Sequence, residues 1–175
     1  MDREGISRRY AKAIYDIAES SEKVGEIREV LNILTENLEE EEEFKNFLSD
    51  PSINLSEKEK FIERTFDFAD EISCNVVKYI VKKGRLPLSF QIKESFLKIY
   101  YEKNNKLPVT GIFAKELSDV QKDNLRKKLE SKYKRKIVLN LLVDEDLIGG
   151  GIIKVGNKII DGSIKNQIGN IKKVF

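Results

Sequence analysis

The 175-residue chain contains no histidine and no tryptophan, and its single cysteine is Cys74. Without histidine there is no Ser-His-Asp or Cys-His catalytic site, no imidazole proton shuttle and no histidine-ligated metal. One cysteine can form neither an internal disulfide nor a zinc ribbon. These absences remove the commonest catalytic equipment. They lower the expectation of an enzyme, although an acid/base enzyme that uses glutamate and lysine stays an alternative whose site the sequence does not define.

Long apolar runs are also missing, since no stretch approaches the ~18 residues of a membrane-spanning helix. The first residues, Met1 to Ile6, include acidic side chains and lack the apolar segment of a secretory signal. A single reduced cysteine fits a cytoplasmic compartment. These features favour a cytoplasmic compartment and argue against a secreted protein.

Charged residues make up 35% of the chain and are unevenly distributed. Residues 1–106 hold 18 lysines and arginines against 22 acidic residues, a net charge of −4. Residues 107–175 hold 14 against 8, a net charge of +6. This asymmetry indicates two parts with different partners.

Hydrophobic spacing in residues 1–106 predicts six amphipathic helices that form a compact bundle. The fourth helix is expected to open at a capping box, Ser56-x-x-Glu59. The fifth spans about 72–83 and ends at Gly84, a favoured residue just after a helix. Its apolar positions cover more than one face, which is typical of a helix that is central or offers a second face to a partner.

Residues 107–175 change to the spacing of strands. We expect strands at 109–113, 137–143, 151–155 and 158–160, the second largely buried and the last two joined by a Gly156-Asn157 hairpin. One helix should begin at the capping box Ser118-x-x-Gln121, and a last one should run from Ser163 to Phe175. The predicted fold is therefore α+β, with a helical bundle in 1–106 and a small α+β domain in 107–175.

Three patterns in the second part invite a chemical interpretation. Gly151-x4-Gly156 has phosphate-loop spacing, but Asn157 stands where the lysine must be. Asp144-Glu145-Asp146 lacks the glycine and distal glutamate of a calcium loop. We interpret Asp144, Gly149, Gly150 and Gly156 as structural, and Asp161-Gly162-Ser163 as a turn followed by a helix cap.

Two surfaces remain open to interpretation. The basic tract from Lys122 to Lys136 is an exposed helix face, a docking site for an acidic protein, or an RNA site of an antitermination-type adaptor. The small residues and tyrosines of the first helix, with Tyr79 and Ile80 of the fifth, form either core or a groove for a partner helix.

Several short motifs resemble one family, and they occur in its order. They are Arg9-Tyr10-Ala11-Lys12-Ala13-Ile14, Gly84-Arg85-Leu86, Asp144-x-x-Leu147-Ile148-Gly149-Gly150 and Ile153-Lys154-Val155-Gly156-Asn157-x-x-x-Asp161-x-Ser163-Ile164. Together they resemble the delta subunit of the F-type ATP synthase, the bacterial counterpart of the oligomycin-sensitivity-conferring protein. The resemblance covers essentially the whole chain, although Lys115-Glu116-Leu117-Ser118 departs from the usual helix start and Gly151 is less usual.

The resemblance implies a non-catalytic stator subunit that links the catalytic F1 head to the membrane-anchored b stalk and resists rotary torque, in a complex driven by protons or sodium ions. It implies that the helical bundle binds the N-terminal helix of an alpha subunit and that the C-terminal domain binds the b subunit. It implies no enzymatic activity, no catalytic residue, metal or cofactor, and no nucleic acid partner. It also implies a peripheral position on the cytoplasmic side of the cell membrane, with contact with the membrane only through the complex. The implied partner-facing residues are Tyr10, Ala13 and Ile14 of the first helix and Val76, Tyr79 and Ile80 of the fifth. Gly84, Arg85, Asp144, Gly149, Gly150, Gly156, Asp161 and Ser163 are implied to be fold determinants.

Overall fold

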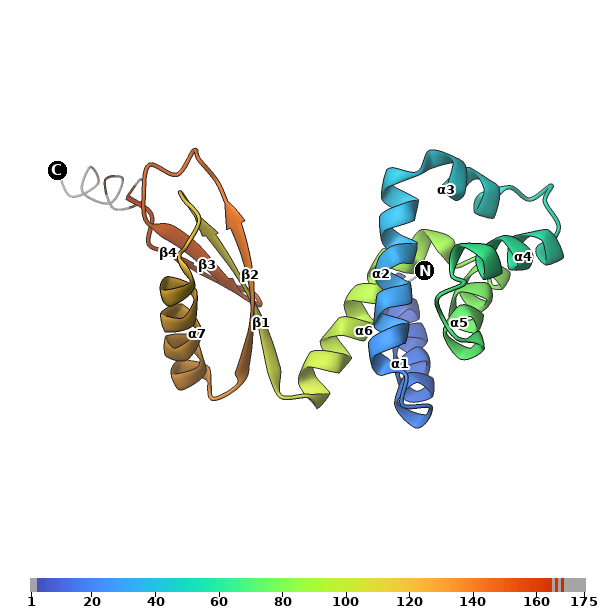
Figure 1. Cartoon of the computed structure of the whole chain (residues 1–175), viewed down its shortest axis with the longest axis horizontal. Coiled ribbons are helices and arrows are strands. Elements are labelled where there is room, and N and C mark those ends of the chain that lie inside the picture. The colour runs from blue at the N-terminus through green and yellow to red at the C-terminus, as the bar shows by residue number, and fades with distance from the viewer. Residues whose placement is uncertain (1–2, 165, 167, 169–175) are drawn as a thin grey trace. The chain divides into compact units, whose positions relative to one another are not determined.

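A computed structural model describes residues 3–164, 166 and 168, and it divides the chain into two compact units, residues 1–100 and 101–175 (Figure 1). The first unit is helical and the second is a sheet with a helix. The chain passes from one to the other in the last turn of helix α6, Ser89–Lys103. The α+β class predicted from the sequence is confirmed.

Six α-helices build the first unit, as the apolar spacing predicts. Their buried stripes meet in one core whose largest enclosed side chains include Phe66 and Phe96. A short 3₁₀ turn, Leu86–Leu88, precedes α6 and contains Pro87, whose fixed φ suits the start of a helix. The other helices are α1 (Arg3–Ser20), α2 (Val24–Glu40), α3 (Glu42–Ser49), α4 (Leu55–Thr65) and α5 (Glu71–Lys82).

The ends of these helices follow from local side chains. The predicted capping box at Ser56 is wrong, because the cap of α4 is Asn54, two residues earlier, which accepts the hydrogen bond from the Glu57 amide at 2.9 Å. Asparagine is as good an N-cap as serine, so the earlier residue satisfies the first free amides. Helix α5 ends as expected at Gly84, which has a φ of +63°.

A buried lysine holds the end of α3 against α4. Lys58 is only 9% exposed, and its ammonium donates to the carbonyl oxygens of Leu48 at 2.8 Å and Asp50 at 2.7 Å. These carbonyls belong to the last turn of α3 and its cap, where helix oxygens lack partners within the helix. Lys58 therefore replaces the missing partners.

Changing Lys58 to methionine is expected to lower the free energy of unfolding by about 2 kcal/mol, because two carbonyl groups lose a charged donor while the side-chain volume stays similar. Urea unfolding followed by helical circular dichroism measures the change. Lys60→Met, at an exposed position of the same helix, is the control. Equal stability of the two variants would contradict this role for Lys58.

The second unit is a four-stranded mixed sheet in the order β2-β1-β3-β4. Strands β1 (Lys106–Phe113) and β2 (Lys136–Val143) are parallel and are connected by α7, Asp119–Tyr133. Strands β3 (Gly151–Val155) and β4 (Lys158–Asp161) form the antiparallel hairpin predicted at Gly156, whose φ is +55°. Strand β1 begins three residues before the predicted start. Pro108 is tolerated there because the pairing with β3 starts only at Val109.

Within the residues that the structure describes, the core of this unit lies on one face of the sheet. Val109, Ile137 and Val155 pack with Leu129 of α7, which runs along this face in Figure 1. The prediction that 137–143 is largely buried is therefore wrong, because Leu142 and Val143 are 49% and 54% exposed. A continuous apolar run suggests that a strand is buried on both faces of its sheet. Among the described helices, α7 covers one face of this sheet, and Leu142 lies on the other.

The last predicted helix is described in part. Ile164, Asn166 and Ile168 are helical, and Ser163 accepts the amide of Asn166 at 3.2 Å as the expected cap. The remainder, through Phe175, lies outside the described residues.

Candidate functional site

Helices α1 and α5 leave an apolar pocket of ≈ 350 Å³ between them. Three large apolar side chains on its rim are unusually exposed: Ile17 by 48%, Ile72 by 40% and Tyr79 by 48%. An exposed apolar cluster of this kind marks an interaction surface more often than isolated surface residues do. The lining residues are Tyr10, Ala13, Ile14, Ile17, Ile72, Asn75, Val76 and Tyr79.

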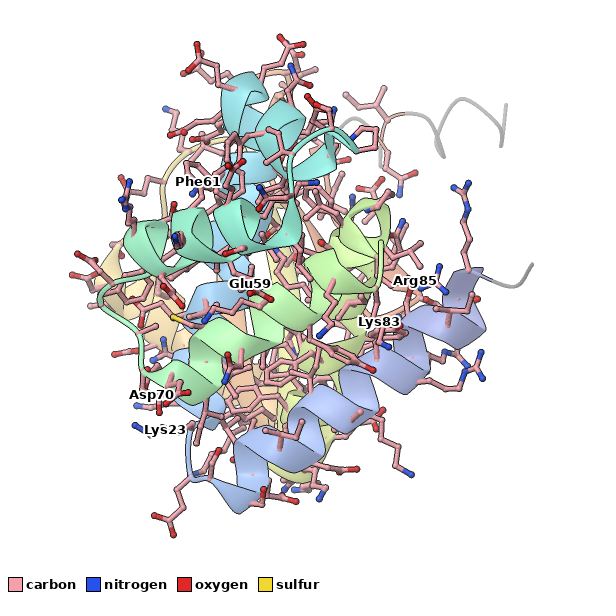
Figure 2. The ribbon with its side chains drawn as sticks, turned by 90° about the vertical axis from the view of Figure 1, so that its right-hand side faces the viewer. Lys23, Glu59, Phe61, Asp70, Lys83 and Arg85 are labelled. Atoms are coloured by element: carbon pink, nitrogen blue, oxygen red, sulfur yellow. The ribbon has the colours of Figure 1, made fainter. Side chains whose placement is uncertain are left out.

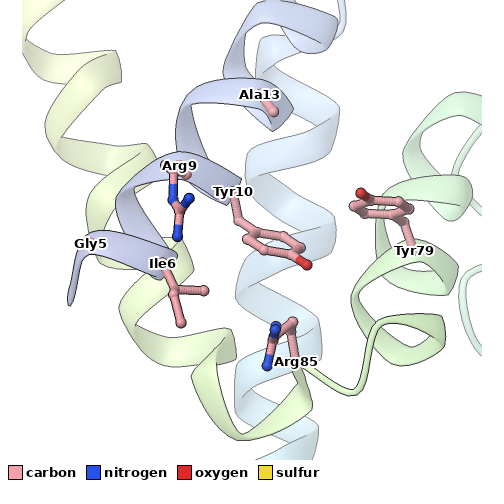
Figure 3. A pocket seen from close by; sticks show the side chains of 7 residues that line it. All are labelled: Gly5, Ile6, Arg9, Tyr10, Ala13, Tyr79 and Arg85. Atoms are coloured by element: carbon pink, nitrogen blue, oxygen red, sulfur yellow. The ribbon is translucent and has the colours of Figure 1, made fainter. Parts of the chain in front are cut away.

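A second pocket of ≈ 860 Å³ continues the first along the same two helices. The two pockets share Tyr10, Ala13 and Tyr79, and the ring centres of Tyr10 and Tyr79 are 5.9 Å apart (Figure 3). The second pocket is also lined by Gly5, Ile6, Arg9 and Arg85. Together the pockets form one trough, which we call the α1–α5 groove.

The groove has a direction because α1 and α5 run antiparallel. The start of α1 lies beside the residues that follow α5, while Ile17 near the end of α1 lies beside Ile72 at the start of α5. From Gly5 to Ile17 the groove follows thirteen residues of α1, a length of about 18 Å at the helical rise. This length accommodates about three turns of a second helix.

The groove brings together five of the six residues proposed as partner-facing. Tyr10, Ala13 and Tyr79 line both pockets, and Ile14 and Val76, which are 4% and 6% exposed, form the floor of the apolar one. Ile80 is fully buried in the bundle core and lines neither pocket. Its helical position turns it away from the groove.

Ile17, Ile72 and Arg85 line the groove but are not among the residues that the sequence predicts to face a partner. For the two isoleucines the sequence does carry a signal. Residues such as Ala11 and Ala18 of α1 and Val77 and Val81 of α5 already form the buried side of each helix. The isoleucines are therefore additional apolar positions outside the side that the core needs.

An ion-pair cluster fixes the start of α5, at the Ile17–Ile72 end of the groove. The Lys23 ammonium lies 3.2 Å from the Asp70 carboxylate and 3.3 Å from that of Glu26 (Figure 2). Asp70 caps α5 by accepting the Ser73 amide at 2.8 Å, and its own amide donates to Glu26 at 2.6 Å. The hydrogen bond to Asp70 raises the pKa of Lys23, and the backbone hydrogen bond from Ser73 is the main cause that lowers the pKa of Asp70. The cluster joins α5 to the start of α2.

The glycine and Asp-x-Ser motifs of the second unit meet at one junction. The Gly162 amide donates to the Gly151 carbonyl, and the Ile164 amide donates to the Gly149 carbonyl, both at 3.0 Å. Gly150 has a φ of +78°, and a Cβ on it would overlap the carbonyl oxygen of Gly162. The motif residues therefore lock the hairpin end to the start of the last helix.

Asp144 and Asp161 each make a turn of the same kind. The Asp144 carboxylate accepts the Asp146 amide at 3.0 Å, and the Asp161 carboxylate accepts the Ser163 amide at 2.9 Å. These hydrogen bonds satisfy backbone donors just after strands β2 and β4. Both aspartates act on the backbone of their own turns.

The stability of the junction is expected to fall in acid through Asp161. Its pKa is lowered from the ordinary 3.8, mainly by hydrogen bonds from the side chain and backbone of Ser163. Because the folded form has the lower pKa, the stabilisation is full above 3.8 and is lost as the pH falls through the folded value. Hydrogen exchange at the amide of Val155 in β3 should therefore accelerate as the pH falls through the folded pKa of Asp161. Asp161→Asn should reduce that acid dependence, whereas Asp146→Asn should leave it unchanged; the same dependence in both variants would contradict the assignment.

Three cations of the basic tract of α7 and its flanks, Lys122, Arg126 and Arg135, make local contacts. Lys122 lies 3.2 Å from Glu116, and Arg126 lies 2.9 Å from Asp123. Arg135 donates to the backbone carbonyls of Tyr101 and Lys106, so it fastens the start of β1 within the second unit. Such contacts fit an exposed helix face and a structural arginine better than a phosphate-binding row.

Two other kinds of site are missing from the part of the chain that the structure describes. None of its helices combines the length and apolarity needed to cross a membrane. Its histidine, cysteine and acidic side chains form no cluster of three that could hold a metal ion. In residues 3–164, 166 and 168 the α1–α5 groove is therefore the strongest candidate site.

Comparisons with known proteins identify the family. Residues 6–175 match the family described as "ATP synthase delta (OSCP) subunit". The chain is 42% identical to an ATP synthase subunit delta of Fusobacterium nucleatum. The 168 aligned residues cover 96% of this chain and 97% of that protein. The chain is also 41% identical, with the same coverage, to a protein of Propionigenium modestum named "ATP synthase subunit delta, sodium ion specific".

A solved structure shares the fold. It is a chain of the Toxoplasma gondii mitochondrial ATP synthase hexamer, with a TM-score of 0.71, 16% identity and 95% coverage of both chains. The family match spans both units and includes the basic tract, so it favours the stator interpretation over the RNA-binding one. The chain belongs to the ATP synthase delta (OSCP) subunit family and is a non-catalytic component of the peripheral stalk of an F-type ATP synthase.

Proposed function

We propose that the α1–α5 groove binds the N-terminal helix of an ATP synthase alpha subunit. The observation that carries this proposal is the continuity of the two pockets along α1 and α5, with Ala13 at their common centre. A small residue there lets another helix approach closely, and the exposed Ile17, Ile72 and Tyr79 supply anchors for an apolar stripe.

We further propose that residues 107–175 bind the C-terminal region of the b subunit, on the cytoplasmic side of the cell membrane. The sheet face opposite α7 supports this assignment. Leu142, Ile112 and Ile152 are aligned across β2, β1 and β3, and they form an apolar row in which Leu142 is 49% exposed. Such a row suits the apolar stripe of a stalk helix.

The mechanism that follows is mechanical. Rotation of the central shaft exerts torque on the catalytic head, and the peripheral stalk must keep the head from turning. An adaptor in this position needs slow dissociation from both neighbours, which buried helix-in-groove contacts provide. Neither binding surface requires a catalytic group.

Calorimetry with the full chain tests the two assignments separately. One titration uses a peptide from the N-terminal end of the alpha subunit (the alpha peptide), and the other uses a peptide from the C-terminal end of the b subunit (the b peptide). Both come from the same organism as the chain. We expect each to bind at one site, and each to bind equally well when the other is already present. Competition between the two peptides, or binding of neither, would contradict the proposal.

A further inference from the structure

The end of the α1–α5 groove near the start of α1 is cationic. Arg9 comes from α1 and Arg85 from the segment after α5, and both line the ≈ 860 Å³ pocket (Figure 3). Lys83 adds a third cation, with its ammonium 5.5 Å from the centre of the Tyr79 ring. Figure 2 shows Lys83 and Arg85 at the same end of the α1–α5 face, away from Lys23 and Asp70.

The two arginines have no acidic partner among the described residues. Neither takes part in an ion pair there, whereas Arg8, the neighbour of Arg9, is paired with Glu4. The Nε of Arg85 is enclosed and has no hydrogen-bond partner in the described part of the chain. An enclosed guanidinium donor without an acceptor is unfavourable, so Arg85 is a cation whose hydrogen-bonding capacity the described part of the chain does not satisfy.

The other half of the groove has the opposite character. Ile14, Ile17, Ile72 and Val76 line it, and Asn75 is the polar residue among them. An occupant of the whole groove must therefore be apolar along most of one face and anionic near one end. A helix that carries a carboxylate next to an apolar stripe has this pattern, and guanidinium groups bind carboxylates with two parallel hydrogen bonds.

We propose that Arg9 and Arg85 form a carboxylate subsite, which binds one acidic side chain of the docked alpha-subunit helix and thereby sets its direction in the groove. This inference rests on the proposed function of the groove. Arg9 and Ile17 are eight residues apart on α1, so the bound carboxylate lies a little over two helical turns, ~12 Å, from the apolar side chain that contacts Ile17 and Ile72. The reversed helix would place an apolar residue on the arginines and the acidic one on the isoleucines.

A double-mutant cycle tests the subsite. The full chain and its Arg85→Gln variant are each titrated with the alpha peptide and with versions of it in which one acidic residue at a time is changed to its amide. We expect Arg85→Gln to lower the affinity for the alpha peptide about tenfold, and one amide peptide to bind the unchanged chain about tenfold more weakly. That amide peptide should bind the Arg85→Gln chain with little further loss of affinity. Arg8→Gln is the control and should bind as the unchanged chain does. Additive losses for every peptide would overturn the subsite.

The outcomes separate this inference from the proposed function. If Ala13→Arg abolishes peptide binding and Arg85→Gln has no effect, the groove stands and the carboxylate subsite is wrong. If no peptide binds, the proposed function itself fails. Should the chain instead bind vesicles containing phosphatidylglycerol through Arg85 while Arg85→Gln leaves peptide affinity unchanged, the subsite belongs to a phosphate group and the proposal is overturned. If Arg85→Gln fails to fold, the same cycle is run with Arg9→Gln, and additive losses for every peptide would again overturn the subsite.

Discussion

Replacing Ala13 with arginine is expected to weaken binding of the alpha peptide by at least about 100-fold, while leaving the stability of the chain unchanged. Ala13 is exposed and lines both pockets, so a long charged side chain fills the groove at its centre without disturbing the core. An apolar helix face would then have to bury a guanidinium or shift away from Tyr79 and Ile72. Calorimetry gives the affinity, and thermal unfolding gives the stability.

Two variants serve as controls for this result. Gln91→Arg adds the same side chain at an exposed position of α6 outside both pockets, and it should bind the peptide normally. Leu142→Asp changes the exposed sheet face of the other unit, and it should weaken binding of the b peptide only. Undiminished binding of the alpha peptide by Ala13→Arg would show that the peptide does not occupy the groove.

Replacing Gly150 with alanine is expected to cause the largest loss of stability in the second unit, about 3 kcal/mol or more. The backbone at Gly150 has a φ of +78°, which costs an alanine about 1–2 kcal/mol. The new Cβ would also overlap the carbonyl oxygen of Gly162, a backbone atom that cannot move aside without breaking the Gly162–Gly151 hydrogen bond. Hydrogen exchange at the amides of β1 and β3 measures the loss.

Gly156→Ala is the matched control. Gly156 also has a positive φ, +55°, but no atom of the described residues lies within 4 Å of the position that a Cβ would take. It should lose only about 1 kcal/mol, the cost of the backbone conformation alone. The difference between the two variants isolates the close approach at the junction. Equal losses would mean that the junction of the glycine and Asp-x-Ser motifs is not tightly packed.

Much of the fold follows from local patterns. Apolar spacing predicts the six helices of the first unit, and Gly84 and Gly156 mark a helix end and a hairpin because few other residues adopt a positive φ. The prediction is wrong at Ser56, since Asn54 is an equally good cap, and at strand 137–143, since an apolar run does not reveal how many faces of a sheet are covered. The order of the strands depends on pairing between distant segments, which the local pattern does not contain.

The groove was only partly predictable for a related reason. The spacing of apolar residues in the sequence identifies the apolar positions of a helix. The position of α5 in the bundle then decides which of them face the core and which face outward. Ile80 belongs to the first class and Ile72 to the second, although both are isoleucines of one helix. Arg85 is a motif residue in the sequence, and only the fold brings it beside Arg9 of α1.

The unequal charge of the two parts agrees with two different neighbours. The first part carries a net −4, and yet its groove ends in a local cluster of cations, Arg9, Lys83 and Arg85. Local charge at the binding surface, rather than the net charge of the unit, sets the direction and specificity of docking. This favours an acidic residue on the helix that the groove receives.

Reconstitution of coupled ion transport tests the central claim most directly. Membranes from the same organism are stripped of the F1 head and of this protein, and purified F1 is added back with the full chain, with Ala13→Arg, or with Leu142→Asp. If the chain joins the head to the stalk through both surfaces, the unchanged chain restores ATP-driven ion transport and F1 binding, and each variant restores neither. Full recovery of transport without the chain, or with both variants, would contradict the account.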